Sequence, residues 1–298
     1  MPLVPMTQLL ADARRSGYAV CYCEACNLES FQGVLEAAEE TRSPIVAGFN
    51  GGFLMHPSRR HPEDLSYYAG MLPVLRAATV PVAFILNETD SMPQIEQAMA
   101  LGFNAIMVEN EHLESGAYRR LVKQVVEQAH PRGIAVEAQL GRLRDASMAG
   151  DLEGQITDPR EAQAFVAETD IDALGVSFGN MHIVTKGKPA VDLEALRKIS
   201  AAVDLPLVVH GGTGFPPDSI ADAIRLGVAK FNFGTGLKQA YLAAVQKKLA
   251  AYREPMNPHP FLGMGGDQDI LVGGREAVKA IVKQLLTLCG SAGRAPDK

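Results

Sequence analysis

Short apolar runs rich in β-branched residues alternate along the chain with longer amphipathic stretches. Such runs, bounded by turn-forming residues, are typical of strands buried on both faces of a parallel sheet. The pattern predicts eight strands, at residues 18–23, 44–49, 81–86, 104–108, 133–138, 172–177, 206–210 and 229–233. It predicts helices after them, at residues 29–41, 62–78, 91–101, 115–130, 159–169, 192–202, 216–226 and 235–252.

Eight strands alternating with eight helices are the count of a (β/α)8 barrel. Two extra helices are expected at residues 5–15 and 274–288, where they would close the bottom of the barrel or mediate association. A chain of 298 residues has a length that this α/β fold routinely fills with one domain, so we expect a single TIM-barrel domain over residues 1–298. The longer connections at 139–158 and 179–191 are candidate lids.

The charge balance narrows the range of partners. The chain has 28 basic and 34 acidic residues, a formal net charge of -6 and no basic block. It therefore lacks the electrostatic footprint expected of a protein that binds nucleic acid or an anionic membrane. The start of the chain does not have the pattern of a signal peptide, and no apolar run reaches the roughly 18 residues that span a bilayer. We expect a cytoplasmic protein.

Three of the four cysteines are clustered, as Cys21, Cys23 and Cys26, and Cys289 lies far away in the sequence. This is not the framework of a disulfide-rich secreted protein. The spacing of the cluster matches no zinc pattern, and alternate residues of a strand point to opposite faces. We expect buried or strand-end thiols, with a dedicated metal site as the alternative.

Polar residues follow the predicted strands at the end that forms the mouth of such a barrel, where catalytic groups of this fold collect. They are Glu24, Asn50, Asn87, Glu88, Glu109, Gln139, Asn180, His182, His210 and Asn232. Imidazole and carboxylate groups together suit zinc and its first-row neighbours, so the pattern favours a divalent-metal site. We predict that His182 and His210 bind the metal; packing or capping is the alternative role.

Two glycine-rich turns follow the last two predicted strands, and each leads into a helix. Glycines let backbone N–H groups approach an anion, and the N-terminus of a helix favours its charge. The turns therefore predict a phosphate site, the usual one for this barrel class. In the alternative interpretation the glycines only make tight turns. The predicted phosphate-binding residues are Gly211, Gly212, Thr213, Asn232, Phe233, Gly234 and Thr235.

Several blocks of the chain resemble the class II, metal-dependent fructose-bisphosphate and tagatose-bisphosphate aldolases. The blocks are GYAVCYCEACNLESFQ, AVEAQLG, DALGVSFGNMHIVTKGKPAVDLEALRKI, LPLVVHGGTGF, AKFNFGTGLKQAY and CGSAGRA, and the resemblance covers nearly the whole chain. It implies an aldolase-like TIM barrel in which a zinc ion, held by three histidines, polarises the carbonyl of a dihydroxyacetone-phosphate unit. His182 and His210 match two of the ligands, and both glycine-rich turns match the phosphate site.

The chain departs from the family after the third predicted strand. The family typically reads HLDH there, with the Asp in proton transfer and the last His as third ligand, whereas this chain has Asn87 and Glu88. An amide cannot transfer a proton near neutral pH, but a carboxylate can bind a divalent ion. We therefore predict the ligand set Glu88, His182 and His210. Zinc is the expected metal, with manganese, iron or cobalt as alternatives.

Further departures lie at Glu24, Glu109, Gln139 and Ile183, where the family has Asn, Asp, Glu and Gly. We take Asn87, Glu88 and Glu109 as the catalytic positions, and Glu24, Glu88 or Glu109 as the source of the missing base. Glu88 has two alternative roles besides that of ligand, namely a base standing off the metal or a carboxylate paired with a nearby Arg or Lys.

Three hypotheses about function follow. The first is a metal-dependent, aldolase-type lyase that acts on a ketose phosphate or another dihydroxyacetone-phosphate-like compound with altered acid/base residues. The second is another metal enzyme on this scaffold, namely an isomerase, a decarboxylase or an iron enzyme. The third is a non-catalytic sugar-phosphate-binding subunit. In each case we expect a small phosphorylated ligand and assembly as a homodimer or homotetramer.

Overall fold

All eight predicted strands close into one parallel barrel, in the order β1-β10-β9-β7-β5-β4-β3-β2, so the predicted (β/α)8 fold is confirmed. The computed structural model describes residues 3–61, 63–109, 113–145, 154–182 and 190–296. The barrel strands are β1 (Val20–Glu24), β2 (Ile45–Asn50), β3 (Val82–Thr89), β4 (Ala105–Val108), β5 (Ala135–Leu140), β7 (Ala173–Val176), β9 (Leu207–Val209) and β10 (Val228–Phe233).

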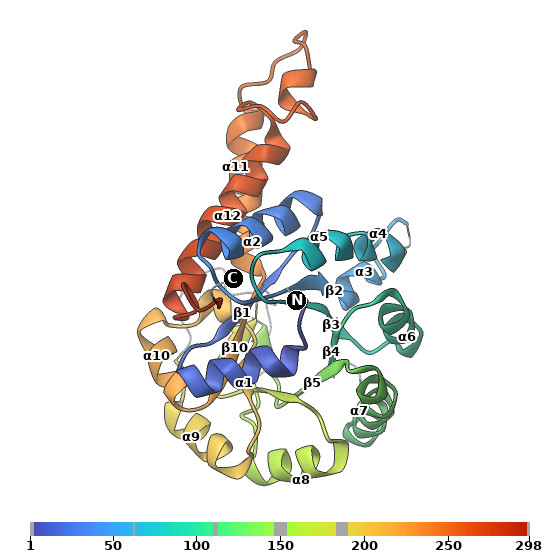
Figure 1. Cartoon of the computed structure of the whole chain (residues 1–298), viewed down its shortest axis with the longest axis vertical. Helices are drawn as coiled ribbons and strands as arrows, with labels where there is room; N and C mark the ends of the chain where they lie inside the picture. Colours follow the sequence, from blue (N-terminus) through green and yellow to red (C-terminus); the bar gives the residue numbers. More distant parts are fainter. Residues whose placement is uncertain (1–2, 62, 110–112, 146–153, 183–189, 297–298) are drawn as a thin grey trace.

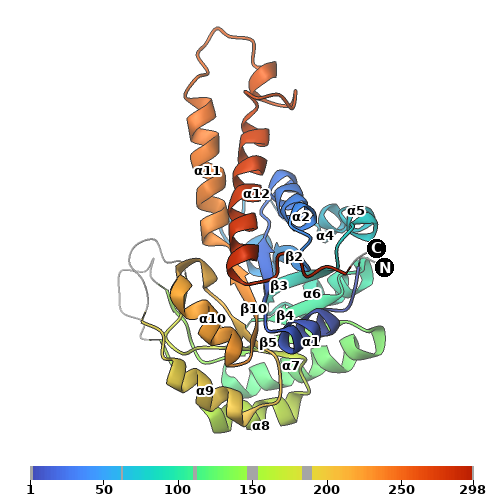
Figure 2. The same ribbon diagram turned by 60° about the vertical axis from the view of Figure 1, so that its left-hand side comes forward.

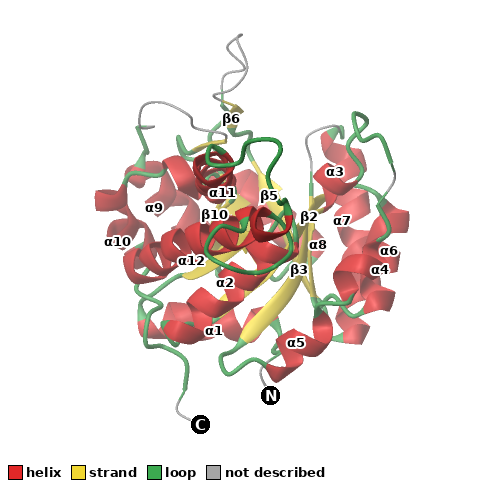
Figure 3. Ribbon diagram, turned by 90° about the horizontal axis from the view of Figure 1, so that it is seen from above, coloured by secondary structure: helices red, strands yellow, loops and turns green. Residues whose placement is uncertain are grey.

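Helices surround the barrel, as Figures 1 and 3 show. They are α1 (Met6–Ser16), α2 (Leu28–Glu40), α3 (Gly51–Leu54), α4 (Leu65–Ala69), α5 (Leu72–Ala77), α6 (Met92–Leu101), α7 (Ser115–Ala129), α8 (Pro159–Thr169), α9 (Leu193–Ala202), α10 (Pro217–Arg225), α11 (Thr235–Leu249) and α12 (Ile270–Leu288). Three 3-10 turns complete the set: η1 (His130–Arg132), η2 (Gly212–Gly214) and η3 (His259–Phe261).

The strands alternate between two apolar layers because successive side chains point to opposite faces. In β3, Phe84 and Leu86 join the layer between the barrel and its helices, whereas Ala83 and Ile85 join the barrel interior. The interior is lined by small alanines from several strands, and α1 fills the remaining space at the bottom with side chains such as Leu10. The predicted role of the N-terminal helix in closing the barrel is confirmed.

Helices α11 and α12 run side by side away from the barrel and form a projecting arm, which is clearest in Figure 2. Their close approach depends on glycine: a Cβ at Gly274 would lie 2.3 Å from the ring of Tyr241, and one at Gly273 would lie 2.4 Å from the stem of Lys248. Helix α12 also packs along α2. The base of the arm is thus held against the barrel wall, next to the second glycine-rich turn.

Three local features differ from the expected elements. The helix expected at 62–78 is two short helices, α4 and α5, which are separated at Gly70 and Met71; Pro73 lies in the first turn of α5. Helix α3 was not expected. The loops expected as lids contain β6 (Arg144–Asp145) and β8 (Met181–His182), which pair in parallel. The rest of both loops, at 146–153 and 183–189, lies outside the described residues.

Two further expectations concern the cysteines and the membrane. Cys21, Cys23 and Cys289 are buried, Cys26 is exposed, and all four are free thiols, in agreement with the expected buried or strand-end thiols. In the described part of the chain, no helix combines the length and the apolarity that crossing a membrane would require.

Candidate active site

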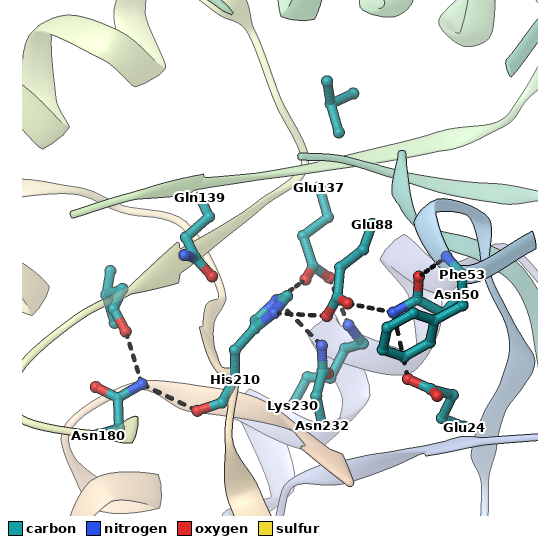
Figure 4. A network of polar contacts seen from close by, with 12 residues as sticks. Glu24, Asn50, Phe53, Glu88, Glu137, Gln139, Asn180, His210, Lys230 and Asn232 are labelled. Carbon is teal, nitrogen blue, oxygen red and sulfur yellow. Dashed lines mark hydrogen bonds and ion pairs between the residues drawn. The ribbon is translucent and has the colours of Figure 1, made fainter. Parts of the chain in front are cut away.

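Polar side chains from several barrel strands meet at the C-terminal mouth of the barrel, and Figure 4 shows them joined by contacts into one network. This mouth network consists of Glu24, Asn50, Glu88, Glu137, His210, Lys230 and Asn232. Each residue lies on a barrel strand or directly after one, so the rigid sheet fixes its position. The mouth is also where this fold carries its catalytic groups.

His210 lies at the centre of the network and is 1% exposed. Its Nε2 lies 2.8 Å from Oε1 of Glu137, and its Nδ1 lies 3.4 Å from Oε1 of Glu88. Because a carboxylate only accepts, Nε2 carries a proton and Nδ1 is the atom that faces Glu88. Burial alone would lower the pKa of His210, but hydrogen bonds and charges of Glu137 and Glu88 raise it to about 9.

Glu137 is held from two sides within the barrel. Its Oε2 accepts from Nζ of Lys230 at 2.6 Å, while Oε1 accepts from His210, and both Glu137 and Lys230 are 0% exposed. Burial would raise the pKa of Glu137, but Lys230 and His210 lower it, so the carboxylate stays charged. A charged acceptor of this kind fixes the orientation of the imidazole ring.

Asn50 connects two further carboxylates. Its Nδ2 donates to Oε2 of Glu88 and lies 3.5 Å from Oε2 of Glu24, while its Oδ1 caps α3 by accepting from the backbone N–H of Phe53 at 2.9 Å. Glu24 also accepts from Nζ of Lys238, which lies 4.1 Å from the centroid of the Phe53 ring. Burial raises the pKa of Glu24, although Lys238 acts in the opposite direction.

Glu88 has an unusual backbone conformation. Its φ is +54°, in the left-handed region that residues other than glycine rarely adopt, and the pairing of β3 with β4 shifts register between Leu86 and Thr89. A bulge of this kind redirects a side chain, and strained conformations of this kind are concentrated at functional sites. The bulge turns Glu88 toward His210.

Two of the three predicted metal ligands face one another. Two ligand atoms that bind one tetrahedral zinc ion, each at about 2.1 Å, lie about 3.4 Å apart. This equals the 3.4 Å between Oε1 of Glu88 and Nδ1 of His210, so these donors fit a shared ion. His182 lies in β8, but its side chain is outside the described part of the structure. Among the described residues, no group of three or more His, Cys, Asp and Glu side chains could hold a metal.

The two predicted phosphate turns pack against each other beside the mouth. Gly211 is left-handed, with a φ of +73°, and a Cβ at Gly212 would lie 2.7 Å from the carbonyl oxygen of Asn232. The hydroxyl of Thr213 accepts from the N–H of Gly236 at 3.1 Å, in the first turn of α11. Gly234, the residue before α11, has no side chain to cap the helix. One N–H group of the first turn of α11 is thus capped from the first glycine-rich turn, and the N-cap residue itself makes no side-chain contact.

The remaining predicted residues differ in what they can contribute. Phe233 packs its ring in the layer between barrel and helices, so only its backbone can contact a ligand. Glu109 follows β4, and its backbone N–H donates to the carbonyl of Thr89 at 3.0 Å. Asn87 is 0% exposed, and its amide has no hydrogen-bond partner among the described residues. A buried amide without a partner is costly, which favours contact with a ligand over simple packing.

Sequence reasoning missed Glu137 and Lys230, and with them the group that orients His210. The signal was present: a charged residue inside an apolar strand such as AVEAQL or VAKFNF must be paired when it is buried. Asn50 was noted only as a polar residue at a strand end, because its contacts with Glu24 and Glu88 depend on the barrel closing.

The whole chain matches known aldolases. Residues 4–294 match the family model described as "Fructose-bisphosphate aldolase class-II". The chain belongs to the class II fructose-bisphosphate aldolase family. A fructose-bisphosphate aldolase of Staphylococcus epidermidis is 34% identical over 296 residues, which are 99% of this chain and 100% of that protein. A probable fructose-bisphosphate aldolase of Bacillus subtilis is 34% identical over 299 residues, which are 99% of this chain and 100% of that protein.

Solved structures agree with this assignment of the class II aldolase family. The YdjI aldolase of Escherichia coli K12 has a TM-score of 0.81 and 30% identity, covering 99% of this chain and 100% of that one. A putative fructose-1,6-bisphosphate aldolase of Coccidioides immitis has a TM-score of 0.80 and 27% identity, covering 96% of each chain. The protein is therefore an aldolase-type lyase of class II, a family that is generally metal-dependent and acts on small phosphorylated sugars.

Proposed function

We propose that this aldolase breaks or forms a carbon–carbon bond in a ketose phosphate whose ketone half resembles dihydroxyacetone phosphate, with acid/base residues altered from those of its family. The observation that carries the proposal is the 3.4 Å approach of Glu88 Oε1 to His210 Nδ1 at the barrel mouth. The two glycine-rich turns lie beside it. Support for the substrate comes from the relatives that are named fructose-bisphosphate aldolase.

The proposed metal ligands are Glu88, His182 and His210, and zinc is the proposed ion. A bound divalent ion would polarise the carbonyl of the ketone half and stabilise the charge that develops on it. Glu137 holds the Nε2 side of His210, so that Nδ1, which faces Glu88, would be the nitrogen that binds the ion. Lys230 in turn holds Glu137 charged and in place. Replacing a histidine ligand by a carboxylate also makes the site more receptive to manganese, iron or cobalt.

The proposed phosphate site consists of the two turns. Gly211 and Gly212 would bring backbone N–H groups close to the ligand, while Gly234 at the start of α11 adds no capping side chain of its own. The dipole of α11, a helix of 15 residues, would stabilise the negative charge of an anion bound at this position. Further contacts are proposed from Thr213 and Thr235 and from the side chain of Asn232.

We further propose that residues 1–298 form a single domain that assembles as a homodimer or homotetramer in the cytoplasm. The support for assembly is the arm, which carries large exposed apolar side chains. They are Leu242, Leu249, Met256, Leu262 and Met264. Apolar side chains gathered on a projecting element are typical of a surface that another chain covers. Light scattering on the wild-type protein and on the double variant Leu242→Glu/Leu249→Glu tests the proposed assembly through the arm. The wild type should be an oligomer and the variant should dissociate; a monomeric wild type would contradict the assembly.

The decisive experiment combines metal analysis with an assay of cleavage. The purified protein is expected to contain close to one divalent ion per chain and to release an aldehyde and dihydroxyacetone phosphate from ketose phosphates. Chelation should abolish turnover, and zinc should restore it. In the presence of metal, dihydroxyacetone phosphate should also raise the melting temperature, because a ligand that binds only the folded state stabilises it.

The other functions considered from the sequence are outcomes of the same experiment. Metal and a melting shift without cleavage of any ketose phosphate would point to an isomerase, a decarboxylase or an iron enzyme. A melting shift without bound metal would point to a non-catalytic sugar-phosphate-binding subunit. Both results would overturn the proposed lyase activity.

A further inference from the structure

Asn180 lies in the connection between β7 and β8, at the barrel mouth, and is 2% exposed. Its Nδ2 donates to the backbone carbonyls of Val176 at 3.2 Å and of His210 at 3.0 Å, and its Oδ1 accepts from the backbone N–H of Phe178 at 2.9 Å. Figure 4 shows the contact with His210. Both N–H bonds of the amide group are thus engaged by the main chain, so the side chain of Asn180 holds two backbone segments together.

The two carbonyls that Asn180 binds belong to neighbouring strands. Val176 is the last residue of β7, and His210 directly follows β9. The ladder between these strands ends with the pair Gly175 and Val208, so both carbonyls lie just beyond it. One side chain therefore continues the connection between β7 and β9 at the point where their pairing stops.

The connection that carries Asn180 is itself closely packed. Gly179 has a φ of +101°, and a Cβ at this position would lie 2.4 Å from the carbonyl oxygen of Ala190. Phe178 is 0% exposed, and its ring packs edge-on against Phe215, with 5.9 Å between the ring centroids. The two residues before Asn180 therefore fix the position of its backbone.

We propose that Asn180 is the positioning residue that sets the separation of the two proposed histidine ligands, an inference that rests on the proposed metal site. Its side chain binds the main chain of His210, and its backbone leads after one residue to His182 in β8. Ligands of a metal site have to be held within about 0.5 Å of the productive geometry. Glu137 holds the ring of His210, whereas Asn180 holds its main chain. Loss of the Asn180 contact would therefore let one histidine move relative to the other.

The variant Asn180→Ala tests this role, with Co²⁺ as the probe. It should bind Co²⁺ about 10- to 100-fold more weakly than the wild type, the loss typical of a group behind the ligands. The visible absorption of bound Co²⁺ should also change, because it depends on the number and arrangement of the ligands. If the alanine variant fails to fold, Asn180→Ser, which keeps a short hydroxyl, is the milder variant for the same two measurements.

Asn104→Ala is the matched control. Asn104 lies directly before β4, at the opposite end of the barrel. Its Nδ2 donates to the carbonyl of Val4 at 2.8 Å, and its Oδ1 accepts from the N–H of Phe84 at 2.7 Å, so it makes the same two kinds of backbone contact. The control should lower the melting temperature but keep the wild-type affinity for Co²⁺ and the wild-type absorption. An equal loss of affinity in Asn104→Ala would overturn the role of Asn180, since any lost backbone contact would then have the same effect.

A double variant tests the separation itself. In the background of His182→Ala only one proposed histidine ligand remains, so Asn180→Ala should weaken Co²⁺ binding by a smaller factor there than in the wild type. Equal factors in the two backgrounds, or wild-type Co²⁺ affinity in Asn180→Ala, overturn the role of Asn180 and leave the proposed function intact. A wild type that binds no Co²⁺ overturns the proposed metal site and this role together.

Discussion

Nζ of Lys230 lies 2.6 Å from Oε2 of Glu137, and neither side chain is exposed to solvent. The two residues come from β10 and β5, which lie on opposite sides of β7 and β9 in the sheet order, so the ion pair crosses the barrel interior. Desolvating two charges is costly, and such a pair is weak evidence for stability by itself. The ion pair has a second effect: its carboxylate, Glu137, contacts His210 and so holds the imidazole in one orientation.

The first prediction concerns this ion pair. Lys230→Met should destabilise the fold by about 3–5 kcal/mol, because it leaves the carboxylate of Glu137 buried and without its cation. The double variant Lys230→Met/Glu137→Gln should recover most of that loss, since no charge then remains unpaired. Denaturant unfolding measures both. The double variant should nevertheless bind metal about 10- to 100-fold more weakly, as expected when a group behind a ligand is lost. Equal stability of the two variants would show that the charges are not coupled.

The second prediction separates the roles of Glu88. Glu88→Gln should lower metal affinity by more than the roughly 100-fold upper limit typical of groups behind the ligands, because it removes a ligand atom. Glu88→His should keep the metal and shift its preference toward zinc, since a histidine set suits that ion. Metal analysis after competition with a chelator gives the affinities. If Glu88→Gln keeps full metal occupancy but loses turnover, Glu88 is the base and not a metal ligand.

The barrel was predictable because its strands are apolar runs that few other structures produce. Each predicted strand overlaps an observed one, although β3 continues to Thr89, three residues past the expected end, through the bulge that carries Glu88. A bulge leaves no apolar signature in the sequence, and neither does the break at Gly70 and Met71 that divides the expected helix at 62–78.

The site was only partly predictable, and for a different reason. His210 and Glu88 were predicted as site residues because both follow predicted strands; His210 also matches a family ligand, and Glu88 stands where the family has one. Glu137 and Lys230 lie inside strands. A single charged residue in a buried strand indicates that an oppositely charged or hydrogen-bonding partner exists, but the sequence does not show which residue that partner is. Asn50 contacts Glu24 from the strand before it and Glu88 from the strand after it. Contacts of this kind depend on the register between strands, which the sequence pattern alone does not fix.

The third prediction is a pH dependence of the metal-free protein. Glu137 and Glu88 raise the pKa of buried His210 from 6.5 to about 9. A folded-state pKa above the unfolded value gives stability that is fully present below about pH 6.5 and lost as the pH rises through about 9. Over this pH range the free energy of unfolding should fall by on the order of 3 kcal/mol. Denaturant unfolding after chelation, between about pH 6 and pH 10, measures it. His210→Gln should remove this slope, and a wild-type curve as flat as that of the variant would contradict the assignment.

The fourth prediction concerns the tip of the arm, which Asp269 organises. Its Oδ2 accepts from the backbone N–H groups of Gly263 and Gly265 at 2.7 and 2.9 Å, and its Oδ1 caps α12 by accepting from Leu271 at 2.9 Å. Although burial acts in the opposite direction, these N–H groups lower the pKa of Asp269. Its contribution to stability is therefore present at neutral pH and is lost as the pH falls through the lowered value.

Asp269→Ala should lower the free energy of unfolding by about 1 kcal/mol, because the helix cap is lost. It should also free the loop whose N–H groups, at Gly263 and Gly265, donate to Oδ2. Hydrogen exchange should accelerate at 263–271 and stay unchanged in the barrel strands, because the lost contacts are local to the tip. Asp267→Ala is the matched control: Asp267 is exposed, and only its backbone carbonyl accepts the contact from Lys248. If the arm mediates assembly, Asp269→Ala should also weaken the oligomer, whereas Asp267→Ala should not. Equal exchange in the two variants would show that the carboxylate of Asp269 does not hold the tip together.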